Sequence, residues 1–331
     1  MIEREPTYKF GSIFADPIEK YLQLRKALGS KITPLGSNLR LFDRYCIEQN
    51  ITVPAITSEL VNNWLTSFPD NKGSSRSQKI SVLKGFSAYY AGGGNIVTWV
   101  PKPGYTNTPK YIPYIFTEDE IQRIMKAADS LRKNFGNTRF HIIFPVILRV
   151  LYGCGLRVSE ALRLRVKDVD LENGFLYIFD GKFEKSRRIP ISESLRTVLS
   201  RYYDGNLDYI GTAENAFFFP NPSGEQYSQR TVYDKFREVL WNCGIPHQGK
   251  GKGPRVHDLR HTFAVRSLHQ SLLSGKNNYT ALTALMVYLG HSKVSSTEYY
   301  LRLTADVYSE IHEKTSAITE RIIPKEVLID E

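Results

Sequence analysis

The sequence predicts a mainly α-helical protein with a small antiparallel sheet, built as a helical N-terminal domain followed by a larger α+β domain. Apolar residues recur at helical spacing through most of the chain, and two short apolar segments flank a turn signal at Asp180-Gly181. Four of the sixteen prolines fall between Pro101 and Pro113, in a stretch without periodicity. We therefore expect domains at 1–105 and 114–331, joined by a linker at 106–113.

Three amphipathic helices are expected in the first domain, at 35–49, 58–68 and 75–91. Thr57 is the expected N-cap of the second helix, and Gly92-Gly93-Gly94 ends the third. The apolar stripes of these helices form the core in the simplest interpretation. The basic side chains outside the stripe of the third helix are then candidates for phosphate contacts: Arg76, Lys79 and Lys84.

The second domain opens with a capping box, in which Thr117 is the N-cap and Glu120 stands three positions later. An apolar helix follows at 140–151. The segments 175–179 and 188–191 are strand candidates on either side of the turn signal, and 216–219 is a further short strand candidate. Most of the remaining chain is expected to be helical.

The charge of the chain favours a polyanionic partner. Its 44 Lys and Arg residues against 34 Asp and Glu give a net charge of +10, spread over both domains, whereas residues 306–331 carry 3 basic and 7 acidic side chains. A solvated basic surface is the alternative interpretation.

Cysteine spacing and hydropathy exclude two classes of protein. The three cysteines are far apart and never in C-x-x-C spacing, which argues against a disulfide framework or a zinc ribbon. No apolar segment approaches the roughly 18 residues that a membrane helix needs. We expect a soluble intracellular protein with no membrane contact.

Three segments contain the residue types that act on phosphate. Arg157 and Glu160 are i,i+3 in Gly155–Glu160, so they share a helix face, although a surface ion pair has the same spacing. His257 and Arg260 project together in the same way from a second segment, where arginine can bind phosphate oxygens and histidine can move protons. The third segment is Leu289-Gly290-His291, followed by two tyrosines that could also be core or surface aromatics.

Two other interpretations of these motifs are weaker. His257, Asp258 and His261 imitate the H-E-x-x-H zinc site, but aspartate is shorter than the required glutamate. The stretch 244–251 follows the G-x-x-x-x-G-K frame of a nucleotide-binding loop, with Gly251 where the magnesium-binding Ser or Thr is needed. A basic flexible loop that touches DNA backbone through Lys250 and Lys252 is the better interpretation.

The order of these motifs resembles that of the tyrosine recombinase, or phage integrase, family over residues 114–305. The order is G-L-R-x-S-E, a hairpin Lys, H-x-L-R-H-T, and then L-G-H with a Tyr nine residues after its His. The resemblance implies a site-specific recombinase that cleaves and rejoins DNA through a 3′-phosphotyrosyl intermediate without ATP, metal or other cofactor. Residues 1–105 would be its DNA-clamping core-binding domain, and the protein would be cytoplasmic and nucleoid-associated in a prokaryote. The implied catalytic residues are Arg157, Lys182, His257, Arg260, His291 and the nucleophile Tyr300, with Glu160 in support.

The chemistry of the reaction suggests a role for each of these residues. The two arginines would stabilise charge on the phosphate oxygens, and His291 would donate to one of them. His257 is the expected base and Lys182 the expected acid, with Lys185 as a nearby competitor and Tyr299 as a competitor for the nucleophile.

Two other functions and three kinds of partner remain to be considered. A DNA-binding regulator on an inactive integrase scaffold and a type IB topoisomerase-like enzyme are the alternatives. Double-stranded recombination sites are the expected partner, with a homotetramer assembled on DNA through the tail at 305–331. Accessory DNA-bending or directionality proteins are a further expectation.

Overall fold

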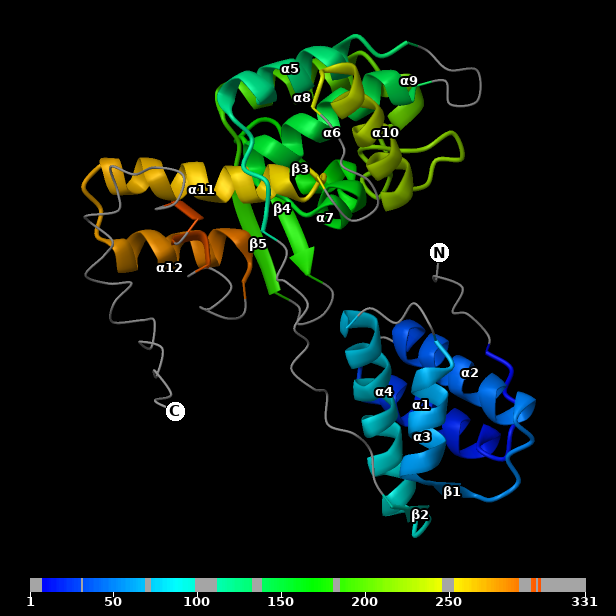
Figure 1. The fold of residues 1–331 in the computed structure, drawn as a ribbon. Helices are drawn as coiled ribbons and strands as arrows, with labels where there is room; N and C mark the ends of the chain where they lie inside the picture. Colours follow the sequence, from blue (N-terminus) through cyan, green and yellow to red (C-terminus); the bar gives the residue numbers. More distant parts are fainter. Residues whose placement is uncertain are drawn as a thin grey trace, which may run out of the picture. The chain divides into compact units, whose positions relative to one another are not determined.

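The computed structural model describes residues 8–30, 32–68, 73–98, 112–132, 139–180, 185–245, 253–291, 299–301 and 303–304. The chain forms two compact units, Met1–Tyr111 and Ile112–Glu331. Helices make up most of both units, and one three-stranded antiparallel sheet lies in the second (Figure 1). The predicted fold class is therefore confirmed. No helix among the described residues is both long and apolar enough to cross a membrane.

Four helices pack around an aromatic core in the first unit. They are α1 (Ala15–Ala27), α2 (Thr33–Glu48), α3 (Ser58–Thr66) and α4 (Gly73–Gly92), with a short parallel pair of strands, β1 (Ala55–Ile56) and β2 (Ile96–Val97). The Thr57 hydroxyl accepts a hydrogen bond from the Leu60 amide, which confirms the predicted cap of α3. Phe42, Trp64 and Phe86 are fully buried in this core.

Helix α1 was not predicted, because few of its apolar residues share one face. Its buried residues are Ile18, Tyr21 and Leu22, and charged or polar side chains fill most other positions. The helix is stabilised by tertiary packing: the Tyr21 ring lies against the rings of Phe86 and Tyr89 on α4.

Helices build most of the second unit as well. They are α5 (Glu118–Asp129), α6 (Phe140–Cys154), α7 (Val158–Arg163), the 3-10 turn η1 (Val166–Asp168), α8 (Glu193–Asp204), α9 (Leu207–Ile210), α10 (Gln229–Asn242), α11 (Asp258–Leu273) and α12 (Asn278–Leu289). Both hydrogen bonds of the predicted capping box are present at the start of α5. Helix α6 is apolar nearly all round, and ten of its fifteen residues are buried.

The sheet consists of β3 (Val169–Asp170), β4 (Phe175–Asp180) and β5 (Lys185–Pro190), in that order. Strands β4 and β5 pair antiparallel with Leu176 opposite Ile189, and both side chains are buried in the core. This pairing confirms the predicted hairpin. The strand expected at 216–219 is wrong: Phe217 forms only an isolated bridge with Arg165, while Phe218 and Phe219 are buried as core side chains.

Helices α11 and α12 pack against each other and against the short helical segment 299–301, with Leu268, Leu285 and Leu301 in their common core. Residues 274–277 connect the two helices. Asn277 caps α12 by accepting a hydrogen bond from the Thr280 amide. This arrangement brings the start of α11 and the end of α12 together with residues 299–301.

Candidate active site

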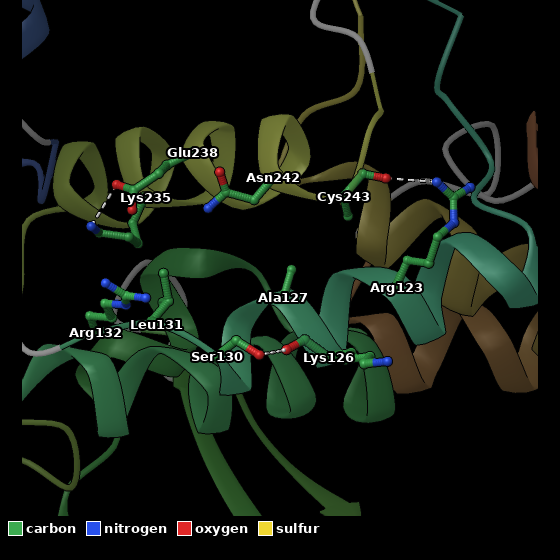
Figure 2. Close-up of a pocket in the computed structure, with 10 residues that line it drawn as sticks. All are labelled: Arg123, Lys126, Ala127, Ser130, Leu131, Arg132, Lys235, Glu238, Asn242 and Cys243. Carbon is green, nitrogen blue, oxygen red and sulfur yellow. Dashed lines mark hydrogen bonds and ion pairs between the residues drawn. The ribbon is translucent and has the colours of Figure 1, made fainter.

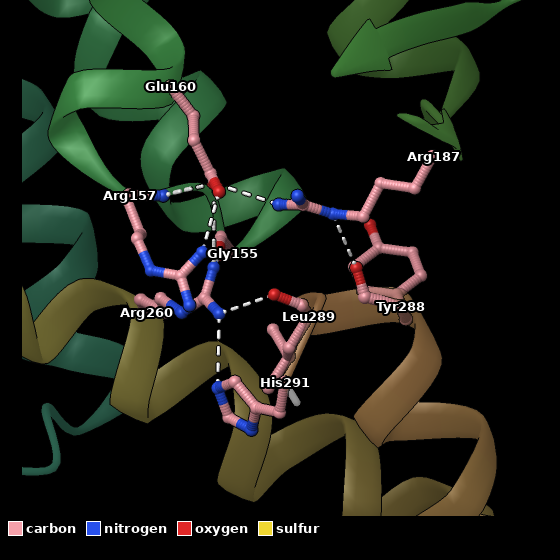
Figure 3. A network of polar contacts seen from close by, with 8 residues as sticks. All are labelled: Gly155, Arg157, Glu160, Arg187, Arg260, Tyr288, Leu289 and His291. Carbon is pink, nitrogen blue, oxygen red and sulfur yellow. Dashed lines mark hydrogen bonds and ion pairs between the residues drawn. The ribbon is translucent and has the colours of Figure 1, made fainter. Parts of the chain in front are cut away.

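The described residues of all three motifs meet in the second unit. Arg157 is the N-cap of α7, His257 and Arg260 stand at the start of α11, His291 directly follows the Gly290 C-cap of α12, and Tyr300 lies in the helical segment 299–301. Figure 3 shows the three arginines around Glu160, with His291 next to Arg260. Lys182 lies outside the described residues.

Glu160 is the centre of the arginine cluster. Its carboxylate accepts hydrogen bonds from the Arg157 Nη1 at 2.7 Å, the Arg157 amide at 2.9 Å and the Arg187 Nη2 at 2.8 Å, and it lies 3.6 Å from the Arg260 Nη1. Burial raises the pKa of Glu160, but Arg187, Arg157 and Arg260 outweigh it and lower the pKa overall. Glu160 therefore stays ionised and holds the guanidinium groups in place.

Arg260 is almost completely buried, with 1% of its surface exposed. Its Nη1 donates to the Gly155 carbonyl at 2.8 Å, and its Nη2 donates to the Leu289 carbonyl at 2.7 Å. These carbonyls belong to the C-terminal ends of α6 and α12, where backbone oxygens lack helical partners. Burial and the Arg157 charge lower the pKa of Arg260 to about 10, so it remains a cation at neutral pH.

The Tyr300 ring lies beside two histidines. It stacks on His291 with ring centroids 6.0 Å apart, and its hydroxyl is 2.9 Å from the His261 Nδ1. The ring is buried, with 3% of the residue exposed. Burial raises the pKa of the hydroxyl, whereas the Arg260 charge and hydrogen bond lower it. A phenol oxygen thus lies next to both a fixed cation and a proton acceptor.

The three histidines of the site are neutral near pH 7. Desolvation, followed by neighbouring positive charges, lowers the pKa of His257 to about 4, of His261 to about 3 and of His291 to about 4. His257 has an exposed surface, but its ring packs edge-on against His261 with centroids 4.8 Å apart. Neutral imidazoles beside arginines can exchange protons while the arginines bind an anion.

The zinc interpretation of the second motif finds no support in this geometry. Asp258 is fully buried, and its Oδ2 accepts a hydrogen bond from the Arg255 amide at 2.7 Å. Within the described part of the chain, no group of three or more His, Cys, Asp or Glu side chains is placed to hold a metal ion. The nucleotide-loop interpretation also lacks its required strand, because helix α10 precedes Gly244.

Two residues of this site were not expected. Arg187, on β5, joins Glu160 to the Tyr288 carbonyl on α12, which its Nε reaches at 3.0 Å. Its partners are 27 and 101 residues away in sequence, so no local spacing predicts them. His261 entered the sequence interpretation only as a zinc ligand, yet it contacts the Tyr300 hydroxyl.

The candidate DNA-contacting residues differ in their surroundings. Lys84 is exposed and Arg76 is half-buried on α4. Lys79 is only 7% exposed: its Nζ donates to the Ser75 hydroxyl at 3.0 Å and lies 4.3 Å from the Phe68 ring centroid. Lys84 and Arg76 are thus accessible, whereas Lys79 packs within the first unit, and a phosphate contact at any of them stays a prediction. Lys250 and Lys252 lie outside the described residues.

A separate groove of about 800 Å³ lies between α5 and α10 (Figure 2). Two of its cations are paired with carboxylates: Lys235 with Glu238 at 2.6 Å, and Arg123 with Asp119 at 2.8 Å. None of the predicted catalytic residues lines it. The arginine and histidine cluster, with its buried phenol, is the stronger candidate for chemistry.

Comparison with protein families matches residues 115–306 to the phage integrase family. The tyrosine recombinase XerD of Pseudomonas putida is 28% identical over 285 residues, covering 83% of this chain and 87% of that protein. The tyrosine recombinase XerA of Pyrococcus horikoshii is 32% identical over 213 residues, covering 63% of this chain and 64% of XerA.

Among solved structures, the fold is similar to that of the XerH site-specific recombinase bound to its difH substrate in a pre-cleavage complex. The TM-score is 0.64 at 18% identity, and the match covers 86% of this chain and 80% of XerH. At this identity the likeness establishes the fold, and the roles of individual residues depend on the geometry described above.

Proposed function

Because this chain belongs to the phage integrase family, we propose that it cleaves and rejoins double-stranded DNA at specific sites through a 3′-phosphotyrosyl intermediate on Tyr300. One observation carries the proposal: the buried Tyr300 hydroxyl lies in the same site as Arg260, whose guanidinium is fixed by two carbonyls and a carboxylate. That combination places a nucleophile next to fixed positive charge, as transfer of a phosphodiester to an enzyme oxygen requires.

The proposed cleavage step uses the arginines as the binding site for the scissile phosphate. The Tyr300 oxygen attacks phosphorus, the bond to the 5′-oxygen breaks, and Arg157 and Arg260 stabilise the charge that develops on the phosphoryl oxygens. His291 donates to one of these oxygens. Lys182 protonates the departing 5′-oxygen, and the reverse sequence rejoins the strand.

The direct test traps covalent complexes on a library of DNA fragments and sequences the attached DNA. Enrichment of one short sequence supports a site-specific enzyme and supplies the substrate for every later experiment. A protein that binds this sequence without forming an adduct would be a regulator on an inactive scaffold. Relaxation of supercoiled DNA without exchange of partners would indicate a topoisomerase instead.

We expect adduct formation to continue in excess EDTA. The guanidinium groups of Arg157 and Arg260 supply the positive charge that a metal ion supplies in other phosphoryl-transfer sites. The amount of covalent complex on the trapped sequence is measured with and without chelator, after the protein has been dialysed against EDTA. Loss of the adduct that magnesium or zinc restores would contradict this prediction.

Lys182 is the proposed general acid, and Lys185 is its competitor. A substrate with a bridging phosphorothiolate has a 5′-sulfur leaving group that needs no proton. We therefore expect Lys182→Ala to lose adduct formation on normal DNA and to regain it on this substrate. Lys185→Ala is the matched control and should be unaffected. Rescue of Lys185→Ala instead would reverse the assignment.

The remaining partners are proposals from the sequence. We propose a tetramer on DNA, assembled through the tail at 305–331, which lies outside the described residues. Accessory DNA-bending or directionality proteins also remain predictions.

A further inference from the structure

His261 has the most direct contact with the proposed nucleophile. Its Nδ1 is 2.9 Å from the Tyr300 hydroxyl oxygen, across 39 residues of sequence. The two ring centroids are 5.5 Å apart, and the His257 ring centroid lies 4.8 Å from that of His261. His261 projects from α11 one residue after Arg260, so the helix that fixes the guanidinium also fixes this imidazole.

The direction of the hydrogen bond follows from the other neighbour of the phenol. Arg260 can only donate hydrogen bonds, and its hydrogen bond and charge favour the ionised form of Tyr300. The guanidinium has no lone pair to receive the phenol proton, so this proton points away from Arg260 and towards the His261 Nδ1, 2.9 Å from the phenol oxygen. A neutral imidazole with its proton on Nε2 has a lone pair on Nδ1 to receive it.

We propose that His261 Nδ1, rather than His257, accepts the Tyr300 hydroxyl proton during strand cleavage. As the bond from the phenol oxygen to phosphorus forms and the bond to the 5′-oxygen breaks, the proton moves to Nδ1 and gives an imidazolium. The same proton returns to the phenol oxygen when the 5′-hydroxyl attacks and Tyr300 leaves. This inference rests on the proposed function and assigns its base.

The surroundings of His261 keep it neutral in the DNA-free protein. Desolvation and the charges of His257, Arg260 and His291 lower the pKa of His261 to about 3 in the DNA-free protein, and Tyr300 faces it from the helical segment 299–301. A bound phosphodiester anion offsets the arginine charge, which raises the pKa of His261 towards a useful value for a base. The site therefore becomes basic when substrate arrives.

Two substitutions separate proton transfer from packing. His261→Asn places an amide near Nδ1, so it retains a hydrogen bond to Tyr300 but accepts no proton, whereas His261→Ala loses both. His269→Asn replaces another buried histidine of α11, two turns away, and is the control for structural effects. Adduct formation is measured on the trapped sequence across a range of pH.

We expect His261→Asn to form adduct about 100-fold more slowly than wild type at neutral pH, the usual contribution of a general base. Its rate should rise steadily with pH as hydroxide takes over, whereas the wild-type rate levels off once His261 is neutral in the complex. His269→Asn should follow the wild-type profile. A His261→Asn variant with the wild-type rate and pH profile would overturn the proposal and leave His257 as the base.

A second substrate tests whether the phosphate site itself survives the substitution. A strand that ends in 3′-p-nitrophenyl phosphate can be joined to a 5′-hydroxyl by the Tyr300→Phe protein, because this leaving group needs neither Tyr300 nor its proton. Adding His261→Asn to Tyr300→Phe should leave that joining rate unchanged. Loss of joining would show that His261 supports the phosphate site only, which also overturns the proposal. If the wild-type protein forms no adduct on any DNA, the proposed function fails instead.

Discussion

Substitution Tyr300→Phe is expected to abolish the covalent DNA adduct while DNA binding persists. The change removes the attacking oxygen and its hydrogen bond to His261 but keeps the ring that stacks on His291 and packs in the core with Leu301. Adduct formation is measured by denaturing gel electrophoresis, and binding by mobility shift on the same DNA. Mass spectrometry of the digested wild-type adduct should locate the nucleotide on Tyr300.

Tyr299→Phe is the matched control for this experiment. The two rings lie 6.3 Å apart, and neighbouring helical residues point about 100° apart, so both hydroxyls cannot face one phosphate. Tyr299→Phe should form adduct at the wild-type rate. Adduct formed by Tyr300→Phe, or a nucleotide found on Tyr299, would contradict the assignment.

Substitution Glu160→Gln is expected to destabilise the DNA-free protein by about 3 kcal/mol and to suppress adduct formation. Its carboxylate is the shared acceptor of Arg157 and Arg187 and the nearby anion of Arg260, and only 11% of the side chain is exposed. A neutral amide would leave three guanidinium groups without their anion. The free energy of unfolding is measured by urea denaturation without DNA.

The exposed pair of Glu193 and Arg196 provides the comparison. It has the same i,i+3 spacing as the pair of Glu160 and Arg157 and the same kind of hydrogen bond, at 2.8 Å, but 75% of the Glu193 side chain is exposed. Glu193→Gln should therefore change the free energy of unfolding by less than about 1 kcal/mol. Equal changes in the two variants would show that Glu160 is not the organising anion of the cluster.

The parts of the fold that could be predicted are those that depend on residues close together in the sequence, such as helix caps, hairpin turns and the apolar face of one helix. The cap at Thr57, the capping box at Thr117 and the hairpin of β4 and β5 were all evident from neighbouring residues, and the structure contains each of them. Strand β3, with two residues, is too short for any periodicity. At 216–219 a short apolar run has the pattern of a strand, although its rings fill the core instead.

In the candidate site too, local motifs predicted some residues, whereas others depend on tertiary packing. Motif spacing predicted that Arg157 lies with Glu160 and His257 with Arg260, and the resemblance added His291. The structure places His257 and Arg260 at the start of α11 and brings Arg157, Glu160, Arg260 and His291 together. The contacts of Arg187 and His261 depend on how β5, α11 and residues 299–301 pack, which no local pattern encodes. Lys79 is also buried, although its place outside the predicted apolar stripe suggested exposure.

The two carbonyls that hold Arg260 have a consequence for how such a protein can diversify. Gly155 and Leu289 contact the guanidinium through main-chain oxygens, which are the same for every amino acid. Exposed side chains of α6 and α12 can therefore change without removing either of these hydrogen-bond acceptors. A lineage could acquire new target sequences through its DNA-facing surface while these two contacts to the reaction centre stay the same.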